Sequence, residues 1–316
     1  MKKKKVAQFA GLLTSSVLTI HLINKLIFFF ATLKEKLVSE NDTFYDWKFG
    51  KIYYRKTGTG SPILLIHDLS PELSAQEWKK TIQYYSQNHT VYAIDLLGCG
   101  RSDKPAITYT NFLYVQLITD FIEDVIKDKV TVIASGLSCS FVIMACHINP
   151  DHYNNLIFIN PLNPDTAKKK CNIQIYNKCI KYLFNVPIIG TMLYNMQFSK
   201  LQLDQKLNHY YFYRKGDYSV TRDLLYEAAH IGTGNNRFLY SSILSNYIQI
   251  DFSVALREIN HNICIIGGEY VKNIEKNMLA YQELNPSIET YIIPDSKQLP
   301  HMENSNAFIE ICKIFL

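Results

Sequence analysis

Short apolar runs alternate with longer amphipathic stretches from Phe44 to the end of the chain. The apolar runs predict buried strands, because they are rich in β-branched residues and lie between turn residues, and the longer stretches predict helices. Alternating strands and helices are typical of an α/β fold with a mostly parallel sheet covered by helices. The predicted strands are Phe44–Phe49, Ile52–Arg55, Ile63–His67, Thr90–Asp95, Val130–Ala134, Asn155–Asn160, Asn262–Gly267 and Ile288–Ile293, and the predicted helices are Gln76–Ser86, Asn111–Ile126, one starting near Cys139, and Asn306–Phe315.

Between the sixth and seventh predicted strands, the pattern is helical and aromatic. This stretch runs from Pro161 to about Ile250 and contains no clear strand pattern. Because strands of the same predicted sheet precede and follow it, we expect a helical cap over one edge of the sheet, inserted into a single domain that spans residues 44–316.

The N-terminal 36 residues differ from the rest of the chain. Four lysines precede Val6–Asn24, a run of nineteen uncharged residues that is long enough to cross a bilayer as a helix. Its polar residues lie all round the helical wheel, which argues against an amphipathic surface helix. No small-residue cleavage site precedes Lys34, so residues 1–36 are predicted to be a retained membrane anchor; a cleaved signal or a helix docked on the domain are the alternatives.

Two observations disagree on which side of the membrane the domain lies. The positive-inside rule places the lysine run in the cytoplasm and the domain outside. The chain has seven cysteines without a CxxC pair, which is typical of free thiols in a reducing compartment and not of a zinc site. The side therefore stays open.

Charge and motifs exclude several function classes. The net charge is +5, and the lysine run supplies four of these charges, so the remainder is near +1. No basic stripe with interleaved aromatic residues remains, which argues against nucleic-acid binding. We expect no cofactor and no metal.

The strongest local pattern is Gly136-Leu137-Ser138-Cys139-Ser140, directly after a predicted strand and before a predicted helix. A serine nucleophile needs a sharp strand-to-helix turn with small residues two positions to either side. Ser138 is therefore the predicted nucleophile, with a helix cap as the alternative. In that geometry the backbone N–H of Cys139 is one oxyanion donor, and the N–H of Leu69, in the loop after the strand ending at His67, is the second.

The segment Asp95-Leu96-Leu97-Gly98-Cys99-Gly100-Arg101-Ser102-Asp103-Lys104-Pro105 resembles the D-x-x-G-x-G-x-S-x-x-P loop of the α/β-hydrolase superfamily, in its esterase, dehalogenase and epoxide-hydrolase branch. Other segments match in the same order: Leu64–Asp68, the Ser138 elbow, Asn160-Pro161, Ile266–Glu269 and Leu299–Glu303. The resemblance covers roughly residues 44–316 and implies an α/β-hydrolase fold. A serine at the elbow implies the ester-cleaving or acyl-transfer members, and His67 is expected to brace its loop.

The residues that the resemblance implies for the base and the acid are substituted. Gln298 occupies the usual histidine position, and His301, three residues later, is the possible replacement base. Val271 occupies the usual acid position, and Asn160 occupies the acid position of some relatives. Glu269 and Asp165 are nearby carboxylates. Glutamine cannot accept and return a proton near neutral pH, so the triad is incomplete.

Three functions are compatible with this pattern. The first is a serine hydrolase of a small ester or acyl substrate that uses His301. The second is a non-catalytic ligand-binding or scaffold protein at the membrane, and the third is weak acyl transfer. The aromatic cap predicts an apolar pocket and a small apolar or ester-type ligand.

Overall fold

The computed structural model describes residues 2–38, 43–171, 175–232 and 234–316, and within these residues the strands form one eight-stranded sheet. The order is β1-β2-β4-β3-β5-β6-β7-β8. β2 runs antiparallel to both of its neighbours, and all later neighbours are parallel. The strands are β1 (Thr43–Trp47), β2 (Gly50–Thr57), β3 (Pro62–Ile66), β4 (Thr90–Ile94), β5 (Val130–Ser135), β6 (Tyr153–Ile159), β7 (Asn262–Gly268) and β8 (Glu289–Ile293).

Helices cover both faces of this sheet, as the continuous apolar strands predict. Every residue of β3 and β5 is buried. Successive side chains of a strand point to opposite faces, so Leu64 and Ile66 pack in one core cluster and Ile63 and Leu65 in the other. The first cluster lies under α3 (Asn111–Phe121), α4 (Ser138–Ile148), α11 (Ser253–Glu258) and α12 (Ile274–Leu284); the second lies under α2 (Lys79–Tyr85) and α14 (Ser305–Cys312).

Helices fill the stretch between β6 and β7, as its pattern predicts. The described part of this cap contains no strand. A small cluster of Tyr194, Phe198, Leu203 and Ala229 forms a core within the cap. The cap helices are α5 (Pro164–Lys170), α6 (Ile175–Asn185), α7 (Ile189–Gln197), α8 (Lys200–Lys206), the π-helical turn Leu207–Tyr211, α9 (Ser219–His230) and α10 (Asn236–Leu244).

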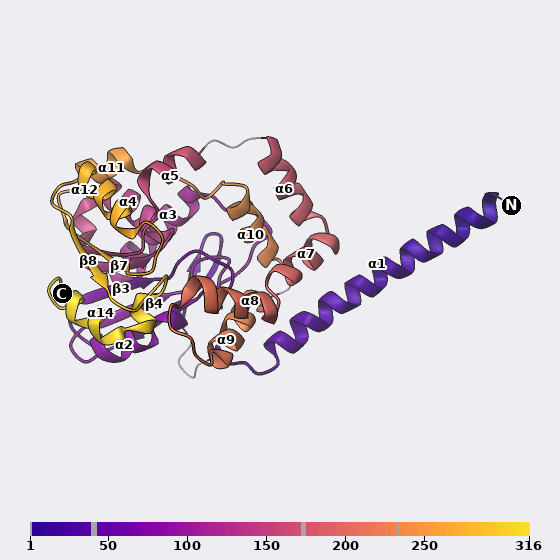
Figure 1. The fold of residues 1–316 in the computed structure, drawn as a ribbon, viewed down its shortest axis with the longest axis horizontal. Helices are drawn as coiled ribbons and strands as arrows, with labels where there is room; N and C mark the ends of the chain where they lie inside the picture. Colours follow the sequence, from indigo (N-terminus) through magenta and orange to yellow (C-terminus); the bar gives the residue numbers. More distant parts are fainter. Residues whose placement is uncertain (1, 39–42, 172–174, 233) are drawn as a thin grey trace.

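The N-terminal helix α1 (Lys2–Thr32) projects away from the rest of the molecule (Figure 1). Its segment Ala10–Thr32 is long and apolar enough to cross a membrane, with a mean hydropathy of 1.6 and only 6% of the segment buried. A signal sequence near the N-terminus has the same length and composition. The C-terminal part of α1 contacts α7 and α9, where Asn24 and Ala31 are buried.

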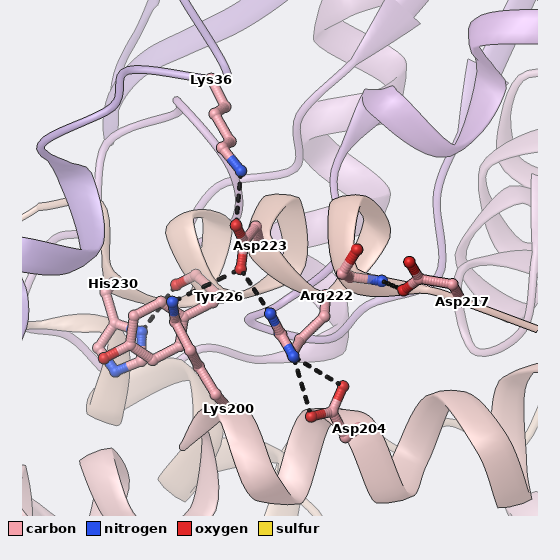
Figure 2. Close-up of polar contacts among 9 residues, drawn as sticks. Lys36, Lys200, Asp204, Asp217, Arg222, Asp223, Tyr226 and His230 are labelled. Carbon is pink, nitrogen blue, oxygen red and sulfur yellow. Dashed lines mark hydrogen bonds and ion pairs between the residues drawn. The ribbon is translucent and has the colours of Figure 1, made fainter.

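A group of charged side chains joins the end of α1 to α9. Asp223 accepts a hydrogen bond from the Lys36 ammonium at 2.7 Å and pairs with Arg222 at 3.3 Å (Figure 2). The hydrogen bond from Lys36 is the main reason that the pKa of Asp223 falls to about 2. The carboxylate of buried Glu227 accepts the backbone N–H groups of Lys36 and Leu37 at 2.9 and 3.1 Å. The chain is therefore held on the cap where it leaves α1.

Candidate functional site

The sharp turn between β5 and α4 is at Gly136. β5 ends at Ser135, Gly136 has a φ of +56°, and Leu137 already has helical angles. The backbone N–H of Gly136 donates to the carbonyl oxygen of Ile159 at 2.9 Å, which holds the turn against the end of β6. A positive φ at the end of a strand and directly before a helix is the strained geometry of a nucleophile elbow. Gly136 is therefore the elbow residue of this protein.

Ser138 lies two residues beyond the turn. It is the first residue of α4, it is fully buried, and its hydroxyl donates to the carbonyl oxygen of His67 at 2.6 Å. The prediction that Ser138 stands exposed as a nucleophile is wrong, because the turn lies at Gly136, two residues earlier than predicted, and Ser138 is already part of the helix. The N–H of Cys139 donates to the carbonyl oxygen of Gly136 at 3.4 Å, within the first turn of the helix, which contradicts its predicted role as an oxyanion donor.

The carboxyl group of Asp68 occupies the space in front of Gly136. A Cβ atom built on Gly136 would lie 2.2 Å from the Asp68 carboxyl carbon, so no side chain fits there while Asp68 keeps this position. The backbone N–H of Leu137 donates to Asp68 Oδ1 at 2.7 Å, and the adjacent backbone N–H of Leu69 favours the charged form of this carboxylate and so lowers its pKa. An oxyanion hole uses these two groups: the N–H after the elbow residue and an N–H from the loop after β3. Here the first binds a carboxylate of the protein itself, and the second lies beside that carboxylate.

Asp68 has an unusual electrostatic environment. Burial raises the pKa of its carboxyl group to about 7, and the nearby Glu77 and Glu72 also raise it, against the hydrogen bonds from Leu137 and Leu69. The group therefore changes its charge near neutral pH.

His67 braces this loop, as expected. The side chain is fully buried, and its Nε2 accepts the backbone N–H of Leu96 at 3.0 Å. Nδ1 must then carry the ring proton, and it donates to the carbonyl oxygen of Asp68 at 2.8 Å. His67 thus ties the loop after β3 to the loop after β4.

A cavity of about 430 Å³ opens in front of the elbow, under the cap. The cap contributes Lys206, whose ammonium lies 2.6 Å from the buried carboxylate of Glu72, and Tyr211, whose hydroxyl donates to the same carboxylate at 2.8 Å. The lining combines these polar side chains with apolar surface. The lining residues are Asp68, Leu69, Ser70, Glu72, Gly136, Leu137, Asn160, Leu162, Lys206, Tyr210, Tyr211, Gln249 and Gln298.

The strand order and the elbow identify the architecture, and comparisons with known proteins agree. A family model described as "alpha/beta hydrolase fold" matches residues 61–178. A serine hydrolase involved in carbazole degradation superposes with a TM-score of 0.70 at 16% identity, over 87% of this chain and 98% of that one. Bromoperoxidase from Bacillus anthracis superposes with a TM-score of 0.68 at 16% identity, over 87% and 99%. The chain has the α/β-hydrolase fold.

Curated proteins match this α/β-hydrolase chain only in part. An uncharacterized protein of Mycobacterium tuberculosis is 29% identical over 107 residues, which are 34% of this chain and 31% of that protein. The 2-hydroxy-6-oxo-6-(2'-aminophenyl)hexa-2,4-dienoic acid hydrolase of Metapseudomonas resinovorans is 30% identical over 86 residues, which are 27% and 30%. The soluble epoxide hydrolase of Corynebacterium sp. is 27% identical over 110 residues, which are 35% and 38%. The match thus spans about a third of the length of these relatives.

Gln298 lines the same cavity as Gly136. Asn160, at the end of β6, holds the loop that carries it: its amide donates to the carbonyl oxygens of Lys297 and Gln298 at 3.0 and 2.9 Å. Its side-chain oxygen accepts the backbone N–H of Gly268 at 3.0 Å. Asn160 therefore positions the backbone and orients no imidazole.

His301 lies outside the cavity. It is buried and stacks on Trp78 with ring centroids 4.4 Å apart, and its Nε2 lies 3.5 Å from Glu77 Oε1. Burial lowers the pKa of His301 to about 3 and raises the pKa of Glu77 to about 8. The hypothesis that His301 replaces the missing base is therefore wrong.

The candidate acids do not face the elbow either. Val271 packs partly buried against the main core cluster, and exposed Glu269 accepts the backbone N–H of Asp295 at 2.9 Å. Asp165 is exposed on α5. None of the three lines the cavity, and neither does any histidine. Among the described residues, no group of three or more His, Cys, Asp or Glu side chains is placed to hold a metal ion.

Two residues of the site, Gly136 and Asp68, are not predicted from the sequence. A signal for Gly136 exists: Ala134-Ser135-Gly136-Leu137-Ser138 also has small residues two positions before and after its centre. That window places Gly136 at the elbow and Leu137 at the donor position. Asp68 follows β3 directly, but nothing in the sequence shows where its carboxyl group points.

Proposed function

We propose that this protein is a non-catalytic, membrane-anchored binding protein built on the α/β-hydrolase fold. The proposal rests on the position of the Asp68 carboxyl group. This group accepts a hydrogen bond from the Leu137 N–H and fills the space that a side chain at Gly136 would occupy. The partial relatives include hydrolases, but this chain departs from a hydrolase at each chemical position of the site.

Each departure removes a separate part of the reaction. Gly136 has no side chain to attack a carbonyl carbon. Gln298 cannot act as a general base, and loss of the base alone costs roughly 10⁶ in kcat in a serine hydrolase. The Leu137 N–H already binds Asp68 and the Leu69 N–H lies beside the same carboxylate, so these groups stabilise no negative charge that develops on a substrate.

The cavity offers polar groups as well as apolar surface, so it supports a ligand that has both polar and apolar parts. Lys206 is paired with Glu72, and Tyr211 also donates to Glu72. The Asp68 carboxylate accepts backbone N–H groups and faces the cavity, so a ligand with an amine or hydroxyl donor has an acceptor there. The helix α1 supports attachment to a membrane.

Covalent labelling with a fluorophosphonate probe tests the absence of a nucleophile. We expect no labelling of the full-length protein or of Asp68→Gly, since opening the site supplies no hydroxyl. The double variant Asp68→Gly/Gly136→Ser places a hydroxyl at the elbow beside two free N–H donors, and it is the positive control for access to the cavity. Adding Gln298→His to this pair should give measurable hydrolysis of p-nitrophenyl acetate.

The matched control is Ser138→Ala, which removes the buried hydroxyl and leaves Gly136 and Asp68 unchanged. Labelling or ester turnover by the wild-type protein that disappears in Ser138→Ala would refute the proposal and restore Ser138 as the nucleophile.

A further inference from the structure

The cap helix α6 presents an apolar face to solvent. Ile175, Tyr176, Tyr182 and Leu183 are 76%, 53%, 76% and 47% exposed, and Cys179 between them is also exposed. These positions follow the spacing i, i+1, i+4, i+7 and i+8, so they lie on one side of the helix. Large exposed side chains scattered singly are ordinary, but a continuous helical face of them marks an interaction site.

The opposite side of α6 packs against the protein and carries a polar residue. Asn177 is 1% exposed, and Phe184 packs edge-to-face on Tyr240 of α10 with centroids 5.2 Å apart. The helix therefore turns polar Asn177 inward and apolar residues outward. A purely aqueous environment does not favour this arrangement.

The connection after α6 contacts α1 at one position, Asn24. The side-chain amide of Asn24 in α1 donates to the carbonyl oxygen of Ile188, in the connection between α6 and α7, at 3.0 Å. Asn195 of α7 donates to the side-chain oxygen of Asn24 at 3.0 Å. The cap thus begins to hold α1 at Asn24. The uncharged part ahead of it, residues 6–23, is about 27 Å long as a helix, which is close to the hydrocarbon thickness of a bilayer.

This geometry places α6 beside the point where α1 would enter a membrane. Figure 1 shows α6 and α7 on the side of the body from which α1 projects. Lys178 is exposed on α6 next to this face, and Lys168 and Lys169 are exposed on α5, which precedes α6 in the chain. Basic side chains beside an apolar helical face suit the headgroup region of an anionic bilayer.

We propose that the α6 face (Ile175, Tyr176, Cys179, Tyr182 and Leu183) inserts into the headgroup–acyl boundary of the same bilayer that α1 crosses. α6 is then an interfacial helix, and the cap rests on the membrane surface. This inference depends on α1 as the anchor, and not on whether the site is catalytic.

Depth-dependent quenching in lipid vesicles tests the inference on the full-length chain. Cys179 is exposed and is labelled with an NBD fluorophore in a Cys171→Ser background, because the other five cysteines are buried. The control probe is Leu279→Cys on α12, in a protein that also carries Cys179→Ser; Leu279 is 59% exposed. In vesicles containing phosphatidylglycerol and nitroxide-labelled lipid, we expect roughly twofold quenching at position 179 and none at position 279.

Charged substitutions show whether the face itself makes the contact. Tyr182→Glu/Leu183→Glu should reduce quenching at Cys179 to the level of the control probe, without a change in melting temperature, because both side chains are exposed. Val254→Glu, at a position that is 61% exposed on α11, should leave quenching unchanged.

Three outcomes overturn the inference and differ from one another. Release of the protein from vesicles by alkaline extraction means that α1 is not an anchor. Retention in the membrane with unquenched Cys179 means that α6 does not touch the bilayer. An unquenched probe at position 179, together with Cys179–Cys179 crosslinks between chains of the unlabelled protein, means that the face binds a second copy.

Discussion

At the scale of single residues, the site is organised around the Asp68 carboxyl group. This group accepts a hydrogen bond from the backbone N–H of Leu137 at 2.7 Å and leaves no space for a side chain on Gly136. One side chain therefore accounts for both the occupied Leu137 donor and the glycine at the elbow. Two predictions follow from its charge and its position.

The first concerns pH. The pKa of Asp68 is about 7 in the folded protein against 3.8 when exposed, so the folded state holds this proton more tightly. The contribution of Asp68 to stability is complete below about pH 4 and declines as the pH rises through 7. Asp68→Asn mimics the protonated form and has no charge to lose. As the pH rises from 5 to 8, the free energy of unfolding of the variant should therefore increase by about 1–2 kcal/mol relative to that of the wild type. Urea unfolding at both pH values measures this. A difference that does not change with pH would contradict the assignment.

The second concerns the contact with Gly136. Gly136→Ser alone should destabilise the protein by about 2–4 kcal/mol, because the new Cβ overlaps the Asp68 carboxyl group and the backbone has a positive φ. Asp68→Gly removes the overlap, so the double variant should recover at least about 1 kcal/mol relative to the sum of the single variants. A thermal-denaturation double-mutant cycle measures the coupling. Strict additivity would show that the two residues do not compete for this space.

At the scale of elements, the cap is attached to the sheet by a buried ion pair. Glu72 lies in the loop after β3, and Lys206 is the last residue of α8. Burial alone raises the pKa of Glu72, but the attraction of Lys206 outweighs it, and the net pKa lies below the ordinary value. The stabilisation from this pair is therefore present above about pH 4.5 and is lost as the solution becomes more acidic.

Lys206→Met should destabilise the protein by about 3 kcal/mol, because Glu72 is left buried without its cation. Lys206→Met/Glu72→Gln should recover part of this loss, since the amide carries no charge. Chemical denaturation at pH 7 compares the two variants. The Tyr211 hydroxyl still hydrogen-bonds Glu72 in Lys206→Met, so an undestabilised single variant would mean that Tyr211 suffices to hold the carboxylate.

At the scale of the whole molecule, α1 both projects from the domain and supports it. Asn24 of α1 accepts a hydrogen bond from buried Asn195 of the cap, and the backbone N–H of Lys36, after α1, donates to buried Glu227. The proposed membrane attachment and the stability of the cap therefore depend on different parts of the same segment.

Two truncations separate these roles. Removal of residues 2–23 should release the protein from membranes and leave the melting temperature unchanged, because the cap contacts begin at Asn24. Removal of residues 1–36 also deletes the Lys36 N–H, which leaves buried Glu227 with one hydrogen-bond donor fewer, and it uncovers Asn195. We therefore expect the free energy of unfolding to fall by about 2–4 kcal/mol. Membrane flotation and thermal denaturation are the measurements. Equal melting temperatures for the two proteins would show that the docking of α1 contributes nothing to stability.

The sequence by itself determined the fold. Apolar runs such as Ile63–Leu65 are buried wherever they occur in an α/β protein, so their spacing alone predicts strands, and the helical period of residues 161–250 predicts a cap. The N-terminal helix is recognisable in the same way, because its composition is local information. The position of Gln298 in the cavity that Gly136 also lines follows from the order of segments along the chain.

Only the tertiary structure decided the chemistry of the site. Gly136 and Ser138 are both flanked by small residues, and the sequence cannot choose between them. Pairing of Ser135 with Ile159 of β6 carries β5 up to Gly136, so the turn falls directly at Gly136, and Ser138 is buried in the first turn of α4. The position of the Asp68 carboxyl group depends on N–H groups that are 69 residues away in the chain. Strand register and side-chain direction are set by contacts between distant segments, and no local pattern records them.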